Sequence, residues 1–149
     1  KGSKTMIVRL MKDEDTEQVE KIEIKTFSRP WSRQGFLDAI RNKDTVYLVA
    51  EEKNEILGYL GLWKSMEEAD ITNVAVKENA RRKGVAGLLL QEAKQIALKE
   101  GVMAFTLEVR VSNQAAIRLY EKHGFHSVGR RPGFYEDPKE DALIMWDNL

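Results

Sequence analysis

The sequence predicts a mixed α/β fold (α+β) with one sheet, and its 149 residues fit a single domain over residues 1–149. Residues 85–99 carry apolar side chains at helical spacing and end before Gly101. Before them come three β-rich runs typical of an antiparallel meander: residues 45–51, 56–63 and 69–76. Strands and helices alternate afterwards, so the pattern favours helices packed on one sheet.

The amino-terminal part predicts one strand followed by two helices. Residues 6–10 have the composition of a short strand, and Asp13 or Asp15 can cap a helix whose apolar residues keep helical spacing over residues 19–27. Ser32 can cap a second short helix. We expect the first five residues, KGSKT, to be a remnant before a native start at the following methionine, and we assign them no function.

The carboxy-terminal part predicts a strand and a helix, closed by two strands. The helix ends at Gly124, and Asp137-Pro138 marks a turn in the last connection. The expected elements are a strand over residues 103–111, a helix over residues 114–123, and strands over residues 125–130 and 142–146. The predicted order is therefore β, αα, βββ, α, β, α, ββ.

Charge and composition exclude several functions. The 24 Lys and Arg residues balance 24 Asp and Glu residues, so no overall field attracts this protein to nucleic acid or to an anionic membrane. No apolar run approaches the roughly 20 residues that a membrane helix needs. The sequence has no cysteine, which excludes disulfides, thiolate metal sites and a cysteine nucleophile, and the cytoplasm is the default location. The two histidines lack metal-ligand spacing, so we expect no metal.

The start of the helix over residues 85–99 has the features of an anion site. It follows a strand after a short turn, and its first N–H groups lie at the positive end of the helix dipole. Cations and small residues gather here: Arg81, Arg82, Lys83, Gly84, Ala86 and Gly87. Cations in the first turn oppose the dipole unless an anion binds, and the small residues let a pyrophosphate approach the backbone. The alternative is a solvated surface turn that the glycines merely shape.

Two polar residues in the next strand and helix are candidates for chemistry. Glu108 points away from the apolar side of its strand, where burial is costly unless a cleft or a partner receives the carboxylate. The alternative pairs Glu108 with Arg110 on a solvated face. Tyr120 lies on the same side of its helix as Asn113, and by itself it is more simply a half-buried aromatic.

Three stretches taken together resemble a known family. ITNVAV, the RRKGVA loop and LEVRVSNQAAIRLYEKHGF have the order and spacing of the GNAT acyl-CoA N-acyltransferases. LEVRVSN with AIRLYEKHGF, the upstream RPWS and the terminal EDALIM look like the ribosomal-protein-alanine N-acetyltransferase (RimI-like) subfamily, over about residues 6–146. The resemblance implies a GNAT-like, mostly antiparallel single sheet with helices on both faces and two splayed strands, with acetyl-CoA in the gap.

The resemblance also implies a role for each site residue. Glu108 matches the family's general base and Tyr120 its general acid, and Asn113 would hydrogen-bond the pantetheine arm. The pantetheine amides would pair with Val74, Ala75 and Val76, and the pyrophosphate would lie on Arg82, Lys83, Gly84, Val85, Ala86 and Gly87. The peptide groove would be flanked by Phe27, Trp31 and a loop with Phe134 and Tyr135. The subfamily commonly has two adjacent tyrosines in that loop; Phe134 replaces the first, so one hydroxyl contact is missing and the substrate range stays open.

The chemistry of acetyl transfer agrees with these roles. An amine must lose a proton before it attacks a thioester, and a carboxylate can take that proton directly or through water. A tyrosine of ordinary pKa, about 10, lies about 1.5 units above a thiol of about 8.5, close enough to protonate the departing CoA thiolate. The resemblance favours a protein or peptide N-terminus as the acceptor, with a ribosomal protein leading. The alternatives are a lysine or polyamine acceptor, and a non-catalytic acyl-CoA-binding regulatory domain.

Overall fold

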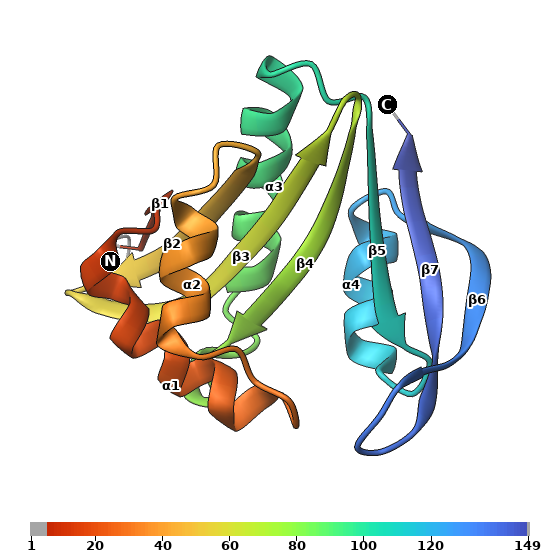
Figure 1. Ribbon diagram of the computed structural model, residues 1–149, viewed down its shortest axis with the longest axis horizontal. Helices are drawn as coiled ribbons and strands as arrows, with labels where there is room; N and C mark the ends of the chain where they lie inside the picture. The colour runs from red at the N-terminus through yellow and green to blue at the C-terminus, as the bar shows by residue number, and fades with distance from the viewer. Residues whose placement is uncertain (1–5, 149) are drawn as a thin grey trace.

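Within residues 6–148, the part of the chain that this computed structural model describes, a seven-stranded sheet carries two α-helices on each face (Figure 1). The expected remnant, residues 1–5, lies outside the described residues. The strands lie in the order β1-β2-β3-β4-β5-β7-β6; β4 and β5 pair in parallel, and the other neighbours pair antiparallel. The prediction of one mostly antiparallel sheet with helices on both faces is confirmed.

The elements follow the predicted order, with short 3-10 helices added before α1 and α3. The strands are β1 (Ile7–Leu10), β2 (Thr45–Glu52), β3 (Glu55–Ser65), β4 (Glu68–Val76), β5 (Ala104–Arg110), β6 (His126–Tyr135) and β7 (Glu140–Asn148). The helices are η1 (Asp13–Asp15), α1 (Thr16–Thr26), α2 (Arg33–Ile40), η2 (Glu78–Ala80), α3 (Val85–Lys99) and α4 (Gln114–Lys122). Across residues 6–148, no helix has the length and apolar character to cross a membrane.

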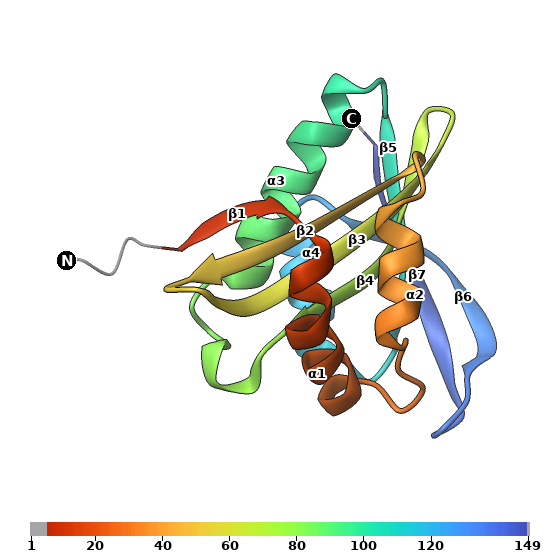
Figure 2. The ribbon, with the colours of Figure 1, turned by 60° about the vertical axis from the view of Figure 1, so that its left-hand side comes forward.

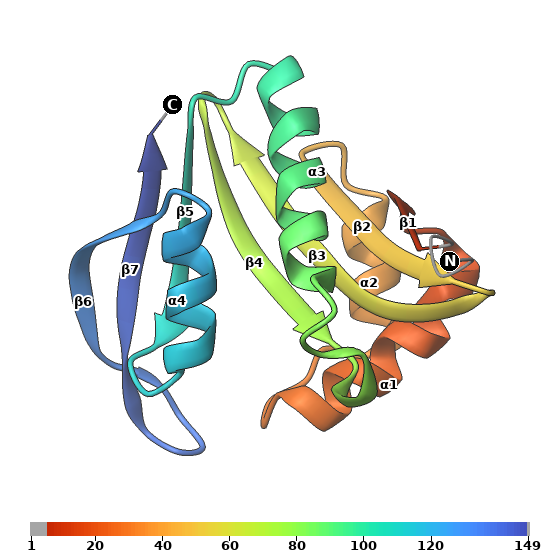
Figure 3. The same cartoon turned by 180° about the vertical axis from the view of Figure 1, so that it is seen from behind.

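Two hydrophobic cores lie on opposite faces of the sheet. Helices α1 and α2 cover one face of strands β2 to β4 (Figure 2), where Val19 and Phe36 pack with Tyr59 of β3. Helices α3 and α4 lie on the other face (Figure 3), where Leu89 and Ile117 belong to a core that continues under β5. Since the second core spans β2 to β5, it holds the two halves of the sheet together behind the point where they separate.

Strands β4 and β5 diverge from a short paired segment. They pair only over residues 68–70 and 104–106, after which β4 runs on to Val76 and β5 to Arg110 (Figure 1). Within the described chain, the facing backbone edges beyond this segment have no strand partner. Such an edge can hydrogen-bond an extended ligand in place of a neighbouring strand. The predicted splayed strand pair is confirmed.

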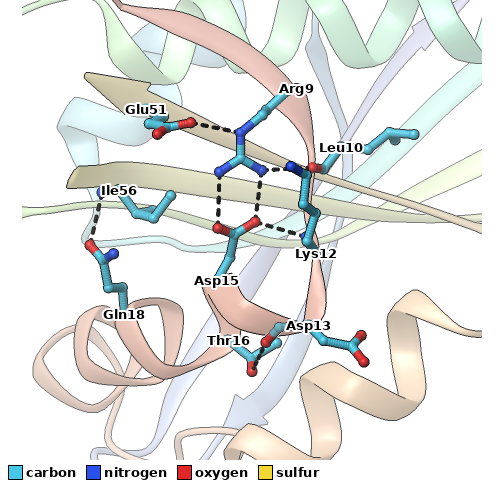
Figure 4. A network of polar contacts seen from close by, with 9 residues as sticks. All are labelled: Arg9, Leu10, Lys12, Asp13, Asp15, Thr16, Gln18, Glu51 and Ile56. Atoms are coloured by element: carbon cyan, nitrogen blue, oxygen red, sulfur yellow. Dashed lines mark hydrogen bonds and ion pairs between the residues drawn. The ribbon is translucent and has the colours of Figure 1, made fainter. Parts of the chain in front are cut away.

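The predicted N-cap position before α1 is correct, but the capping bond expected from the acidic side chain is absent. Asp15 is the N-cap of α1 but makes no capping bond with its side chain. Its carboxylate instead accepts the Lys12 N–H at 2.8 Å and both arms of the Arg9 guanidinium at 2.8 and 2.9 Å (Figure 4). Arg9 Nε also donates to Glu51 of β2 at 2.7 Å. The 3-10 turn directs Asp15 back to the sheet, so it joins β1 and β2 to the start of α1.

We expect Arg9→Ala to lower the free energy of unfolding at pH 7 by about 2 kcal/mol, because it leaves the buried Asp15 carboxylate without its charged partner. Burial opposes the shift, but the bonds from Arg9 and Lys12 hold the pKa of Asp15 below its usual value. The stabilisation is therefore complete above the usual aspartate pKa and is lost as the pH falls through the lowered one. Urea denaturation of variant and wild type should give a difference that shrinks below about pH 4.

A control for this prediction is Arg41→Ala. Arg41 forms a 2.8 Å ion pair with Asp13, but both side chains are 58% exposed. An exposed pair of this kind contributes about 0.5 kcal/mol or less. A loss in Arg9→Ala no larger than in Arg41→Ala, or one that does not depend on pH, would contradict the role given to Asp15.

Two further expectations differ from the structure in position. Helix α3 begins at Val85, so Arg81, Arg82 and Lys83 precede the helix and do not occupy its first turn. Phe134 and Tyr135 end strand β6 and do not lie in a loop, because pairing with β7 resumes after an irregularity at Tyr135, which lies opposite Glu140. In both cases the boundary of the element differs from the prediction by a few residues. The turn at Asp137-Pro138 occurs where the sequence predicts it.

Candidate active site

A cavity of about 1230 Å³ opens where β4 and β5 diverge. Its size exceeds the roughly 300–1,000 Å³ usual for one small ligand, so it has room for two substrates. The sequence-predicted residues that line it are Phe27, Trp31, Val74, Ala75, Val76, Arg81, Arg82, Gly84, Val85, Ala86, Gly87, Glu108, Asn113, Tyr120, Phe134 and Tyr135. Lys83 is exposed and is not among the lining residues. No cluster of metal-ligating side chains occurs in residues 6–148.

The end of the cavity at α3 presents backbone N–H groups without partners. Gly84, the N-cap of α3, has φ 79°, and Arg82 has φ 67°. The left-handed conformation is natural for glycine and strained for arginine, and such strain is common at ligand sites. The first helical bond runs from the Leu88 N–H to the Gly84 carbonyl, so among the described residues the three preceding N–H groups have no backbone acceptor. This end of the cavity can bind an anion.

Glu108 lies on the β5 face that is turned away from the buried core. Its neighbours on both sides in β5 are buried, so strand alternation directs the carboxylate into the cavity, with 22% of the side chain exposed. Its Oε2 accepts from Nε of Arg131 in β6 at 3.2 Å. Arg110 bonds Glu140 instead, so the alternative of a Glu108–Arg110 pair on a solvated face is wrong.

Helix α4 contributes Asn113 and Tyr120 to the cavity wall. Asn113 caps the helix, since its Oδ1 accepts the Ala116 N–H at 3.2 Å, and its amide N–H₂ makes no bond to the described residues. Tyr120 is 8% exposed and packs its ring 5.8 Å from that of Phe125. Its hydroxyl has no hydrogen-bond partner in residues 6–148, yet no fully buried polar side-chain atom there lacks one, so the hydroxyl must open to the cavity.

Burial raises the pKa of Tyr120 to about 12, with a smaller contribution from Tyr135. The sequence-based assumption of an ordinary phenol pKa is therefore wrong, because the ring lies inside the core that α4 shares with β5. The phenol keeps its proton throughout the neutral range. It is an available proton donor, and it cannot act as a base there.

Aromatic residues from two distant segments line the other end of the cavity. Phe27 and Trp31 precede α2, and Phe134 and Tyr135 end β6. Phe27 and Phe134 are 38% and 47% exposed, more than a core aromatic would be. The Arg110 guanidinium lies 4.4 Å from the centre of the Tyr135 ring and fixes it from the β5 side. These exposed rings can pack against a bound peptide.

An ion pair joins these two segments across the mouth of the cavity. Arg29 Nε lies 2.7 Å from Asp137 Oδ2, and both residues line the cavity. Their side chains are 70% and 60% exposed, so the pair contributes little to stability and can open at small cost. The segment before α2 and the turn after β6 are thus in contact, but this ion pair does not hold them rigidly in place.

The sequence analysis did not assign two acidic residues near the site. Glu23 of α1 lines the cavity and is 2% exposed. Glu23 lies four residues after Val19 and directly after Ile22, which are both buried in α1. This helical spacing was the signal in the sequence that Glu23 faces inward. Asp70 faces Thr106 where β4 and β5 last pair, and burial, then the charge of Glu108, raises its pKa to about 6. Nothing local to its sequence marks Asp70, since both its burial and the nearby charge of Glu108 arise only in the folded sheet.

The cavity combines a helix start that can bind an anion with a carboxylate and a phenol that can transfer protons. These are groups that a group-transfer enzyme uses. Comparison with protein families agrees, because residues 14–125 match the model described as the Acetyltransferase (GNAT) family. The chain belongs to this family and is an N-acetyltransferase.

Relatives and solved structures of similar proteins extend over most of the chain. A Bacillus subtilis (strain 168) protein, provisionally named a ribosomal protein bS18-alanine N-acetyltransferase, is 39% identical over 140 residues, 93% of each chain. The N-alpha-acetyltransferase of Saccharolobus solfataricus is 33% identical over 146 residues, 89% of this chain and 86% of that one. The crystal structure of the ribosomal-protein-S18-alanine N-acetyltransferase from Escherichia coli has a TM-score of 0.88 at 28% identity, covering 97% of this chain and 94% of that one. The resemblance predicted from the sequence is confirmed.

Proposed function

We propose that this protein transfers the acetyl group of acetyl-CoA to the α-amine of a protein N-terminus, with a ribosomal protein as the leading acceptor. The observation that carries the proposal is that Glu108, Tyr120 and the open start of α3 all line one cavity at the fork of the sheet. The names of the relatives from Bacillus subtilis and Saccharolobus solfataricus support a protein acceptor.

Acetyl-CoA would lie along the fork, with its diphosphate on the unpartnered N–H groups at the start of α3 and near Arg81 and Arg82. The free edge of β4 at residues 74–76 offers N–H and C=O groups to the pantetheine amides, and Asn113 has a free amide to donate. A backbone N–H near Val76 would donate to the thioester oxygen as negative charge develops on it.

In the reaction itself, the acceptor amine would attack the thioester carbon directly while both substrates are bound. A C–N bond forms and the C–S bond breaks; Glu108 takes the proton lost by the amine, directly or through water, and Tyr120 gives its proton to the CoA sulfur. The chain has no cysteine, so an acetyl-cysteine intermediate is excluded. Both side chains line the cavity from different elements, as two-sided proton transfer requires.

The acceptor is inferred from the cost of deprotonating it. An α-amino group has a pKa of about 7.8 and a lysine about 10.4, so the free lysine amine costs about 3.5 kcal/mol more at neutral pH. A single carboxylate base, paired with Arg131 at 3.2 Å, suits the easier proton. A lysine acceptor on the same scaffold is the rival, because a site can lower a lysine pKa.

The test is incubation with labelled acetyl-CoA and four peptides, with the amino end free or blocked and with or without an internal lysine. We expect label on every peptide with a free amino end and on no blocked peptide. Label on the blocked peptide that contains lysine would favour the rival acceptor. CoA binding without transfer to any peptide would favour a regulatory acyl-CoA-binding domain.

We expect Gly84→Leu to weaken acetyl-CoA binding by at least about tenfold, because its side chain would occupy the place of the diphosphate. The matched control is Gly101→Leu at the other end of α3. Both glycines have positive φ, 79° and 93°, and neither has a heavy atom within 4 Å of where a Cβ would lie. Each substitution should therefore cost a similar 1–2 kcal/mol or so of stability from strain alone. Equal CoA dissociation constants for the two variants by calorimetry would mean that the diphosphate does not bind at Gly84.

A further inference from the structure

Two glutamates one turn apart on helix α1 bind the backbone next to Phe27 and Trp31, the aromatic residues that line the cavity before α2. Glu20 Oε2 accepts the backbone N–H of Arg33, and Glu23 Oε2 accepts the backbone N–H of Trp31, each at 3.0 Å. These bonds hold the point where the chain leaves the wall segment, residues 27–31, and enters α2. They differ in burial, because the Glu20 bond is exposed while Glu23 is 2% exposed.

Glu23 also connects the wall segment to the sheet. Its Oε1 accepts the hydroxyl of Tyr59, a residue of β3 with no exposed surface. Tyr59 lies opposite Ala75 of β4, the strand on the cofactor side of the cavity. Direct contacts therefore run from Trp31 through Glu23 and Tyr59 to β4, and they set the distance between the two walls of the cavity.

Burying the Glu23 carboxylate costs free energy, which indicates that its role is to position the groups that it binds. Burial raises the pKa of Glu23, although bonds from Trp31 and Tyr59 oppose the shift. A raised pKa means that the contribution of Glu23 to stability is fully present below the usual glutamate pKa and is lost as the pH rises through the raised one. Near neutral pH a neutral side chain that made the same two bonds would be at least as stable.

We propose that Glu23 is a positioning residue for acetyl transfer, fixing the wall segment at the distance from β4 at which a bound peptide amine reaches the thioester. The inference rests on the proposed function, because the wall segment matters only if a peptide lies against Phe27 and Trp31. Misplacement of a bound reactant by about 1 Å can cost about 10²-fold in rate. The effect should fall on the acceptor, since the diphosphate end of the cavity is formed by α3.

The test compares Glu23→Ala with Glu20→Ala, each of which removes one acceptor of a backbone N–H: Trp31 in the wall segment or Arg33 at the start of α2. We expect Glu23→Ala to raise KM for the peptide about tenfold and to lower kcat/KM about 10²-fold, with KM for acetyl-CoA within about twofold of wild type. Glu20→Ala should change each constant by less than about threefold. Glu23→Gln can still accept the Trp31 N–H through its amide oxygen, so it should keep kcat/KM within about threefold of wild type.

Two further measurements keep the inference testable if Glu23→Ala folds poorly or turns over slowly. Tyr59→Phe removes only the sheet-side bond and should raise KM for the peptide about threefold. Amide hydrogen exchange of the Trp31 N–H needs no turnover, and its protection should fall in Glu23→Ala and persist in Glu23→Gln. An unchanged peptide KM despite lost Trp31 protection would overturn the proposal, as would a Glu23→Gln variant as slow as Glu23→Ala with that protection intact. Failure of the proposed function would be separate, since wild type would then acetylate no α-amine.

Discussion

Replacement of Tyr120 by phenylalanine is expected to lower kcat by about 10²- to 10³-fold and to leave acetyl-CoA affinity within about twofold of wild type. The change removes a hydroxyl that opens to the cavity and leaves the ring packed 5.8 Å from Phe125. A general acid acts only as the thiolate leaves, so kcat and kcat/KM should fall together. Steady-state kinetics and calorimetric CoA titration measure the two quantities separately.

The raised pKa of Tyr120 adds a pH criterion. With a pKa of about 12, the phenol stays protonated across the usual assay range, so Tyr120 should produce no loss of rate below about pH 10. The burial that weakens the phenol as an acid also destabilises a thiolate beside it, so the two proton affinities rise together. An alkaline loss of rate between pH 8 and 9 that disappears in Tyr120→Phe would contradict this account.

Tyr135→Phe is the contrasting variant for the same cavity. Burial, then the charge of Glu108, raises the pKa of Tyr135 to about 12 as well, but this residue ends β6 on the side of the cavity that we propose binds the peptide. Loss of its hydroxyl should raise KM for the peptide severalfold and change kcat less than Tyr120→Phe does. If the two variants lost kcat equally, the role of proton donor could not be given to Tyr120.

Local patterns in the sequence were sufficient for much of this site. Strand alternation put Glu108 opposite the buried side of β5, and the two glycines around the first residues of α3 marked a helix start that can receive an anion. Such patterns depend on residues close together in the chain. The resemblance to the family then related Tyr120 and Glu108 to each other, which alternation and spacing could not do alone.

The features that the sequence did not reveal depend on contacts between distant segments. Glu23 meets Tyr59 across 36 positions, and the pKa of Asp70 is raised by burial in the sheet and then by the charge of Glu108 in the neighbouring strand. Asp15 could cap a helix by its type and position, but Arg9 offers it two stronger bonds. In each case the local preference is weak, and tertiary packing decides where the carboxylate points.

Glu108→Gln is expected to lower kcat/KM for a peptide with a free amino end by about 10²-fold or more near pH 6.5, because the amide cannot take the amine proton. The side chain keeps its size and an oxygen that can accept from Arg131 Nε, which lies 3.2 Å from Oε2 in the wild type. Binding of acetyl-CoA should therefore be unchanged. The control is Glu136→Gln, since Glu136 also lines the cavity but its side chain makes no hydrogen bond or close ion pair with the described residues; its kcat/KM should stay within about twofold of wild type.

The pH dependence of this variant would identify the acceptor as well as the base. As the pH rises past the pKa of the acceptor amine, the amine arrives already neutral, and the deficit of Glu108→Gln should narrow from about 10²-fold toward about tenfold. For an α-amine this narrowing should be centred near pH 8; for a lysine it should begin only near pH 10. A deficit that stays constant from pH 6.5 to pH 9.5 with an α-amine peptide would mean that Glu108 orients the acceptor or the fork of the sheet and takes no proton.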